Sequence, residues 1–331
     1  MYNVTGHTLT QGINGNARPK SYVYKDGGDT LFEKEYLELL TTKKATGIYI
    51  DPDCRNDVGK TSYYTDLTWF LKSQEKKYAS LYSFLAPRKV SGEDDKSNKN
   101  ADDYKITVIK NGKALMRLTS DQFGFNAAET IYNSDKYPLA RLLNSPPEDR
   151  SLEEVKQFIV TYVKNTRTIG GAFVWPLPLE GRRICLYNTN RGIKGYLQDR
   201  VDLTLLEIKH VFDKGYDEGR YKSDLLYSLY CNEKTQLKEW FQHFNSFAEY
   251  IEYFMLEPFV NNVKGQMMPI NIIRDEPIDE EDVKDQKKCK DQLQNLRSEE
   301  LIEMLKRLQV MILKRSKNME AACYRIHCFG E

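Results

Sequence analysis

TIGGAFVWP (168–176), ICLYNTNRG (184–192) and GYLQDRVDLTLLEIKHVF (195–212) are three neighbouring runs that decide the fold of this chain. The first two begin with short apolar segments, rich in β-branched and aromatic residues, which is typical of buried strands. Pro178 and Gly181 lie in the connection between these segments, so an antiparallel hairpin is their simplest pairing. The third run has the period of a helix. The stretch therefore predicts two strands that lead through a polar loop into a helix.

The predicted helix at 195–212 carries apolar residues on two sides. One stripe, spaced for a single face at about 100° per residue, consists of Leu197, Val201, Leu205, Ile208 and Phe212. Leu203 and Leu206 lie away from this stripe, on the side that carries most of the charged residues. A helix that is apolar on two sides is typical of burial between layers, and a buried charge in such a helix needs a partner.

The polar residues of the loop and helix allow two interpretations. In the first, Asp199, Arg200 and Asp202 form a structural network of ion pairs that ties the helix to its sheet. In the second, the loop presents backbone N–H groups and side chains to an anion near the helix start. The candidate anion-binding residues are Asn188, Asn190, Arg191 and Arg200. The candidate catalytic residues, for proton transfer, are Asp199, Glu207 and His210.

The rest of the chain contributes further strand and helix signals. A hairpin is expected at 104–118, around Asn111-Gly112, and Thr119-Ser120-Asp121 could cap a turn or helix after it. Ser151 and Glu154 form a capping-box pattern at the start of a helix that reaches about residue 164. Further helices are expected at 138–144, 246–256 and 298–314, and a late strand at 267–273.

We therefore expect an α+β fold, with a mixed or mainly antiparallel sheet covered by helices near 151–164, 195–212 and 235–256. Residues 1–30 are expected to be a partly ordered lead-in, and residues 31–274 a single domain. Residues 275–331 are expected to form a charged linker and a C-terminal helical extension, which packs on the domain or contacts a partner.

Composition bounds the class of protein. Of the 331 residues 40% are hydrophobic and 29% are charged, as in ordinary globular proteins. The net charge of +1 provides no long-range electrostatic attraction to nucleic acid or anionic lipid, although it is compatible with a local basic patch. The N-terminus lacks a signal-peptide core, no stretch approaches about 18 consecutive apolar residues, and the six cysteines form no C-x-x-C. We expect a reduced cytoplasmic protein that does not contact a membrane.

Other motifs fail on their spacing. Gly59-Lys60-Thr61 resembles the end of a phosphate-binding loop, but Cys54 stands where that loop needs its first glycine. Cys323, His327 and Cys328 could offer metal ligands, but a zinc site needs three or four and the sequence has no second cluster, so no metal is predicted. The four histidines show no triad signature, and the sequence names no cofactor.

The central motifs resemble those of an uncharacterised bacterial family, a domain of unknown function. Its pattern combines a T-I-G-G strand ending in proline, an N-x-x-R-G loop and a D-R-x-D-L-T-L helix. The matching residues are Thr168 to Gly171, Pro176, Asn188, Arg191-Gly192, Asp199-Arg200 and Asp202 to Leu205. The resemblance covers about 39–272 and implies no particular activity. Here Leu206 separates L-T-L from Glu207, whereas the family pattern has its acidic residue directly after L-T-L.

Two functions follow as hypotheses. The first is an enzyme or toxin directed at a nucleotide or nucleic acid, of the kind found in phage-defence modules. In it, Arg191 and Arg200 bind phosphate, and Asp199 or Glu207 transfers a proton. The alternative is a non-catalytic interaction or sensor protein that binds a protein partner through its C-terminal helix, at 298–314.

Overall fold

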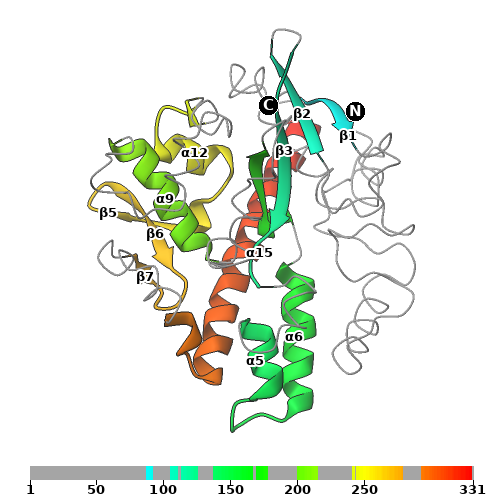
Figure 1. Ribbon diagram of the computed structural model, residues 1–331, viewed down its shortest axis with the longest axis vertical. Helices are drawn as coiled ribbons and strands as arrows, with labels where there is room; N and C mark the ends of the chain where they lie inside the picture. Colours follow the sequence, from blue (N-terminus) through cyan, green and yellow to red (C-terminus); the bar gives the residue numbers. More distant parts are fainter. Residues whose placement is uncertain are drawn as a thin grey trace.

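The computed structural model describes nine segments of the chain, which contain two antiparallel sheets and the helices packed around them (Figure 1). These segments are residues 87–91, 105–110, 113–125, 137–166, 169–177, 200–214, 241–242, 244–278 and 292–329. The fold is α+β with antiparallel strands and a C-terminal helix, as predicted. The expected lead-in, the apolar run at 184–187 and the loop at 188–192 lie outside the described residues.

The larger sheet has four antiparallel strands in the order β1-β2-β3-β4. They are β1 (Pro87–Ser91), β2 (Lys105–Lys110), β3 (Lys113–Gln122) and β4 (Ala172–Leu177). The hairpin predicted around Asn111-Gly112 is confirmed, because β2 and β3 pair with Lys110 opposite Lys113. The segment Thr119 to Asp121 belongs to β3 and pairs with β4, so the expectation that it caps a turn or helix was wrong. The long-range partner β4 keeps this segment extended.

The smaller sheet has the order β5-β6-β7 and is also antiparallel. Its strands are β5 (Val260–Val263), β6 (Gln266–Asn271) and β7 (Glu276–Pro277). The β5–β6 turn places Gly265 at φ 84°, which suits glycine, and the Gly265 N–H donates to Asn262 Oδ1 at 2.9 Å. The predicted late strand is confirmed as β6, and a turn at 272–275 ends it.

The helices are α5 (Pro138–Asn144), α6 (Leu152–Thr166), α9 (Val201–Lys214), α12 (Phe247–Tyr253) and α15 (Ser298–Phe329), with 3-10 turns η2 (Ile169–Gly171) and η4 (Glu257–Phe259). The capping box before α6 is confirmed. Ser151 Oγ accepts the Glu154 N–H at 3.3 Å, and Glu154 Oε2 accepts the Ser151 N–H at 2.8 Å. Helix α12 is shorter than expected, since Met255 at φ 52° has left the helical conformation.

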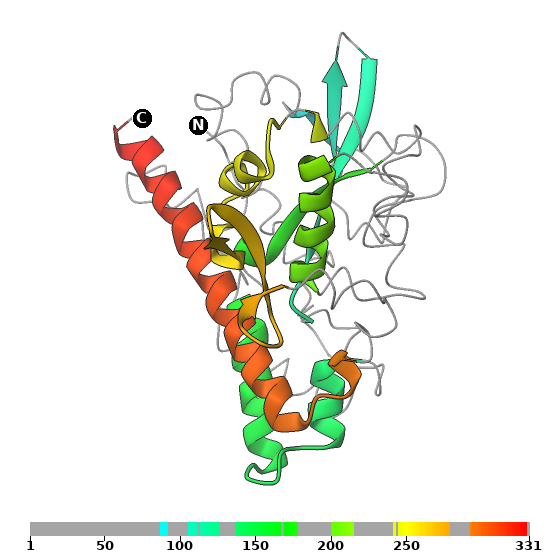
Figure 2. The same cartoon turned by 90° about the vertical axis from the view of Figure 1, so that its left-hand side faces the viewer.

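Helix α15 is the longest helix of the described structure. It continues for 32 residues, well past the predicted end at 314, and contacts η2, α6, η4 and α5. Figures 1 and 2 show it running from the end that holds α5 and α6 past the smaller sheet. The buried residues of the predicted apolar stripe are Leu301, Met304, Leu305, Leu308 and Ile312. Other elements of this chain therefore cover the apolar stripe of α15, which the alternative function assigns to a protein partner.

Aromatic side chains form a cluster around α12. The ring of Tyr250 lies 4.8 Å from that of Phe254 and 5.0 Å from that of Phe244, measured between centroids. Phe212 of α9 joins the cluster through an edge-to-face contact with Phe241 at 5.7 Å. These distances suit favourable aromatic packing, so the aromatic block is core and fixes α12 against α9.

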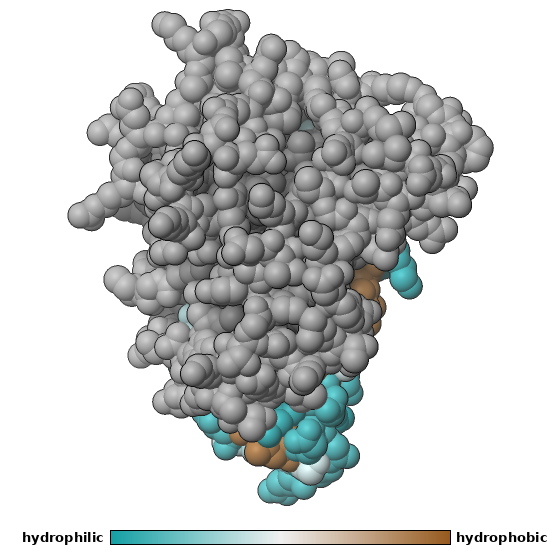
Figure 3. All heavy atoms as spheres, turned by 90° about the vertical axis from the view of Figure 1, so that its right-hand side faces the viewer, coloured by the Kyte–Doolittle hydropathy of each residue, from teal (hydrophilic) through white to brown (hydrophobic). Residues whose placement is uncertain are grey.

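The visible surface of the described residues is mainly hydrophilic in Figure 3, with small apolar patches at the lowest end of the molecule and at its right edge. Within the described segments the exposed large apolar side chains are Leu152 and Val310, at 44% and 62% exposure. Single exposed apolar residues are ordinary on proteins. The helices that the structure describes include none with the length and apolarity needed to span a bilayer.

Candidate functional site

Helix α9 is enclosed by protein along almost its whole length. Every residue from 201 to 211 is buried, and Phe212 is half-buried. Among the described elements, β6 and α12 both contact this helix, which Figure 1 shows lying beside them. The two-sided apolar pattern had predicted such a position, and the prediction is confirmed.

Several polar side chains are buried with the helix. Glu207 and His210 are 7% and 4% exposed, and their spacing of three residues places them on one face, about a turn apart. Asp202 and Lys209 are also buried and, seven residues apart, share a different face. Lys209 forms an ion pair with Asp213 one turn further along. The polar side chains therefore divide into two groups on different sides of α9.

Arg200 and Asp202 form a bidentate ion pair at the start of the helix. Arg200 Nε donates to Asp202 Oδ1 and a terminal nitrogen donates to Oδ2, both at 2.9 Å. The two side chains are 1% and 0% exposed. Arginine matches a carboxylate in this two-point geometry, and burial makes the loss of either partner costly. This contact supports the first interpretation, in which Arg200 and Asp202 hold the helix in place.

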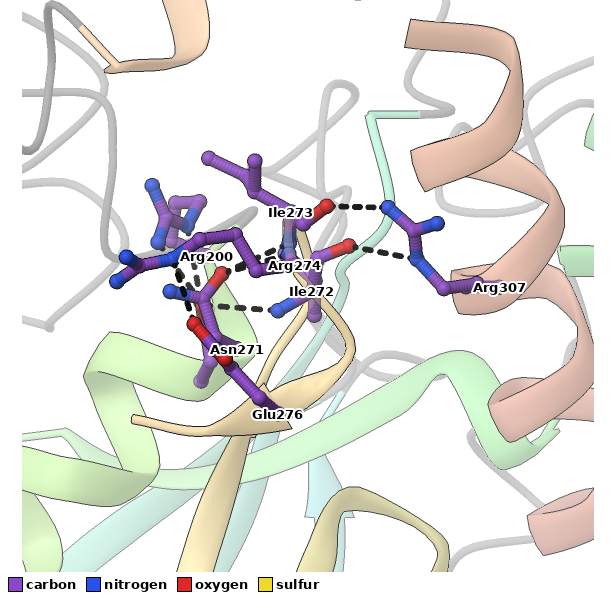
Figure 4. A network of polar contacts seen from close by, with 8 residues as sticks. Arg200, Asn271, Ile272, Ile273, Arg274, Glu276 and Arg307 are labelled. Atoms are coloured by element: carbon purple, nitrogen blue, oxygen red, sulfur yellow. Dashed lines mark hydrogen bonds and ion pairs between the residues drawn. The ribbon is translucent and has the colours of Figure 1, made fainter. Parts of the chain in front are cut away.

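Asp202 also joins the helix to the smaller sheet. Its Oδ2 accepts the backbone N–H of Ile272, which follows β6, at 3.2 Å. Asn271, the last residue of β6, accepts the N–H groups of Ile273 and Arg274 at 2.9 and 3.2 Å through its side-chain oxygen. At the surface, Arg274 pairs with Glu276 at 3.1 Å (Figure 4). The carboxylate thus fastens α9 to a turn that is itself braced.

The structure places three of the seven predicted site residues. Arg200, Glu207 and His210 are all buried in or beside α9, whereas Asp199 and the loop residues Asn188, Asn190 and Arg191 lie outside the described residues. Arg200 is brought to Asp202, while Glu207 and His210 share a face. The described segments contain no group of three or more His, Cys, Asp or Glu arranged to hold a metal ion.

Sequence reasoning missed two contributions to this region, the backbone N–H of Ile272 and the side chain of Arg307. A backbone N–H carries no sequence signal. Arg307 lies in α15, and its guanidinium donates to the backbone oxygens of Ile272 and Ile273. Only the folded chain brings α9, the turn after β6 and α15 together.

Fold and site together define an α+β protein whose central buried helix carries an acid and an imidazole on one face. Residues 96–290 match the Family of unknown function (DUF6994), and this segment spans more than half of the chain. The chain therefore belongs to this family, which confirms the expected membership of an uncharacterised domain family. No curated protein and no solved structure matches the chain significantly. The matched segment ends before α15 begins.

Proposed function

We propose that this protein binds an anionic ligand of the nucleotide or nucleic-acid class beside α9 and transfers a proton there. The observation that carries the proposal is the placement of Glu207 and His210, both buried and one turn apart on the same face. Burying an ionisable group is costly, and such groups gather where a protein performs acid–base chemistry. A carboxylate and an imidazole are the two side chains most used for that chemistry.

The anion-binding part of the proposal rests on the predicted loop at 188–192, which precedes α9 in the sequence and lies outside the described residues. Asn188, Asn190 and Arg191 all lie within it, and the planar guanidinium of Arg191 suits phosphate. Arg200 has a different role in this proposal, since two of its nitrogens already bond Asp202. We assign Arg191 to the anion and Arg200 to the start of the helix, with Asp199 as a further candidate for proton transfer.

Binding can be tested by titrating the purified chain with nucleoside mono-, di- and triphosphates and with short single-stranded DNA and RNA in a calorimeter. We expect Arg191→Ala to weaken binding about tenfold or more, because it removes a charged contact to phosphate. Arg297→Ala is the matched control, since Arg297 is exposed and forms an ion pair with Glu300 just at the start of α15. Equal losses in both variants, or no binding by the wild type, would contradict the proposal.

Chemistry can be tested by incubating the same ligands with the protein and separating the products by mass. Glu207→Gln and His210→Gln should each lower the rate by about 10²- to 10⁴-fold, the usual contribution of a proton-transfer group. Glu299→Gln, at an exposed position in the first turn of α15, should leave the rate unchanged. A rate that survives in both α9 variants would remove these residues from the mechanism.

A further inference from the structure

The peptide groups around Ile272 are held by two different helices. Its N–H donates to Asp202 Oδ2 of α9 at 3.2 Å, and its carbonyl oxygen accepts from Arg307 Nε of α15 at 3.3 Å. A terminal nitrogen of Arg307 also donates to the carbonyl oxygen of Ile273. Figure 4 shows the guanidinium directed at these two consecutive carbonyls. A short piece of backbone thus connects the start of α9 with the N-terminal third of α15.

This connecting turn, at 272–275, is braced from within. Besides the two bonds to the Asn271 side chain, the Asp275 N–H donates to the Asn271 carbonyl at 2.8 Å. Asp275 adopts a left-handed conformation at φ 59°, and Ile272 is fully buried. These hydrogen bonds fix the peptide groups of the turn that lies between Arg307 and Asp202.

Helix α15 is itself anchored on both sides of Arg307. At its start, Ser298 Oγ donates to the Ser145 carbonyl at 2.6 Å. Two turns beyond Arg307, buried Arg315 donates to the Gly170 carbonyl at 2.9 Å and to the Phe254 carbonyl at 2.9 and 3.1 Å. These bonds hold α15 in place, so the guanidinium of Arg307 has a fixed position relative to the turn at 272–275.

From these contacts we infer that Arg307 is a positioning residue for the site on α9. It acts through the turn at 272–275 and Asp202 to set where α9 begins, and hence where Glu207 and His210 lie. The inference rests on the proposed function for its meaning, but its structural part is testable alone. It also assigns part of the site's support to α15, which lies beyond the segment that matches the family.

The first test uses NMR and needs no ligand. In Arg307→Gln, we expect the Ile272 amide to exchange with solvent about tenfold faster and the His210 imidazole signals to shift. The His210 signals are assigned by their loss in His210→Gln. Arg307→Lys should recover part of the protection, because an ammonium can bond one of the two carbonyls. Arg297→Gln is the control, since Arg297 is exposed and pairs with Glu300.

Unchanged Ile272 exchange and unchanged His210 signals in Arg307→Gln would overturn the inference. If that variant does not fold, the comparison passes to Arg307→Lys, where wild-type values at both probes would overturn it equally. Where wild-type turnover is detected, Arg307→Gln should lower the maximal rate about tenfold while nucleotide affinity changes less than twofold. A wild-type protein that binds no nucleotide refutes the proposed function alone, because the NMR result still decides the role of Arg307.

Discussion

Replacing Gly170 by alanine should strongly destabilise this protein, because the added methyl group has no room. A Cβ at this position would lie 2.3 Å from the Ile312 carbonyl oxygen, 2.4 Å from Ser316 Oγ and 2.6 Å from Ser316 N. Two of these three atoms belong to the backbone of α15 and cannot rotate away. The glycine of the T-I-G-G motif is therefore required for the close approach of η2 to α15.

The magnitude follows from two effects. Forcing a methyl group into a packed contact costs about 1–3 kcal/mol. Moving η2 away would also weaken the bond from the Gly170 N–H to Ser316 Oγ, at 3.0 Å, and the bond from Arg315 to the Gly170 carbonyl, at 2.9 Å. Each such bond contributes about 1 kcal/mol, or somewhat more when it is charged. We expect a loss of about 3–5 kcal/mol in the free energy of unfolding.

Urea unfolding followed by circular dichroism measures this loss. With a slope of roughly 3 kcal/mol per molar urea, the midpoint should fall by about 1 M or more. Gly265→Ala is the control, because a Cβ there has nothing within 4 Å and meets only the strain of φ 84°, about 1–2 kcal/mol. A Gly170→Ala protein as stable as the Gly265→Ala protein would refute the reasoning from close contact.

The other predictions concern the two best-defined polar motifs. Asp202→Ala should cost about 3–5 kcal/mol in urea unfolding, since it leaves the guanidinium of Arg200 buried without the carboxylate that it binds through two nitrogens; a loss below about 1 kcal/mol would contradict this. Hydrogen bonds from the backbone and side chain of Ser151 hold the pKa of Glu154 below its ordinary value. The Glu154 carboxylate therefore stabilises the fold at pH values above its ordinary pKa. This stabilisation is lost as the pH falls through the lowered pKa of the folded protein. Wild type should therefore be more stable than Glu154→Gln near neutral pH, with the difference vanishing in acid, and a difference independent of pH would count against the capping box.

Local features could be predicted because their determinants lie close together in the chain. Ser151 and Glu154 are three residues apart, so the capping box was readable before the helix was seen. The bounds of α5 follow from its early proline and the Ser-Pro-Pro sequence after it. The burial of α9 followed from its two apolar sides. In each case one short segment carries the whole signal.

Contacts between distant segments were not readable in the same way. Strand β4 pairs with β3, which local order did not suggest, while the expected partner at 184–187 lies outside the described residues. The depth of α15 in the core was also underestimated, since an amphipathic stripe shows that a face will be covered but not by what. Arg307 bonds backbone carbonyls, and these are the same in every residue.

The sequence by itself determined the α+β class, the hairpin before Gln122, the capped helix α6 and the inward position of α9, because periodicity and capping are properties of neighbouring residues. The tertiary structure alone decided that Arg200 is bound to Asp202, that Asp202 holds the turn after β6, and that α15 closes the core through Arg307 and Arg315. These contacts depend on which buried groups meet across the fold, and a buried charge or carbonyl takes the partner that packing places within reach.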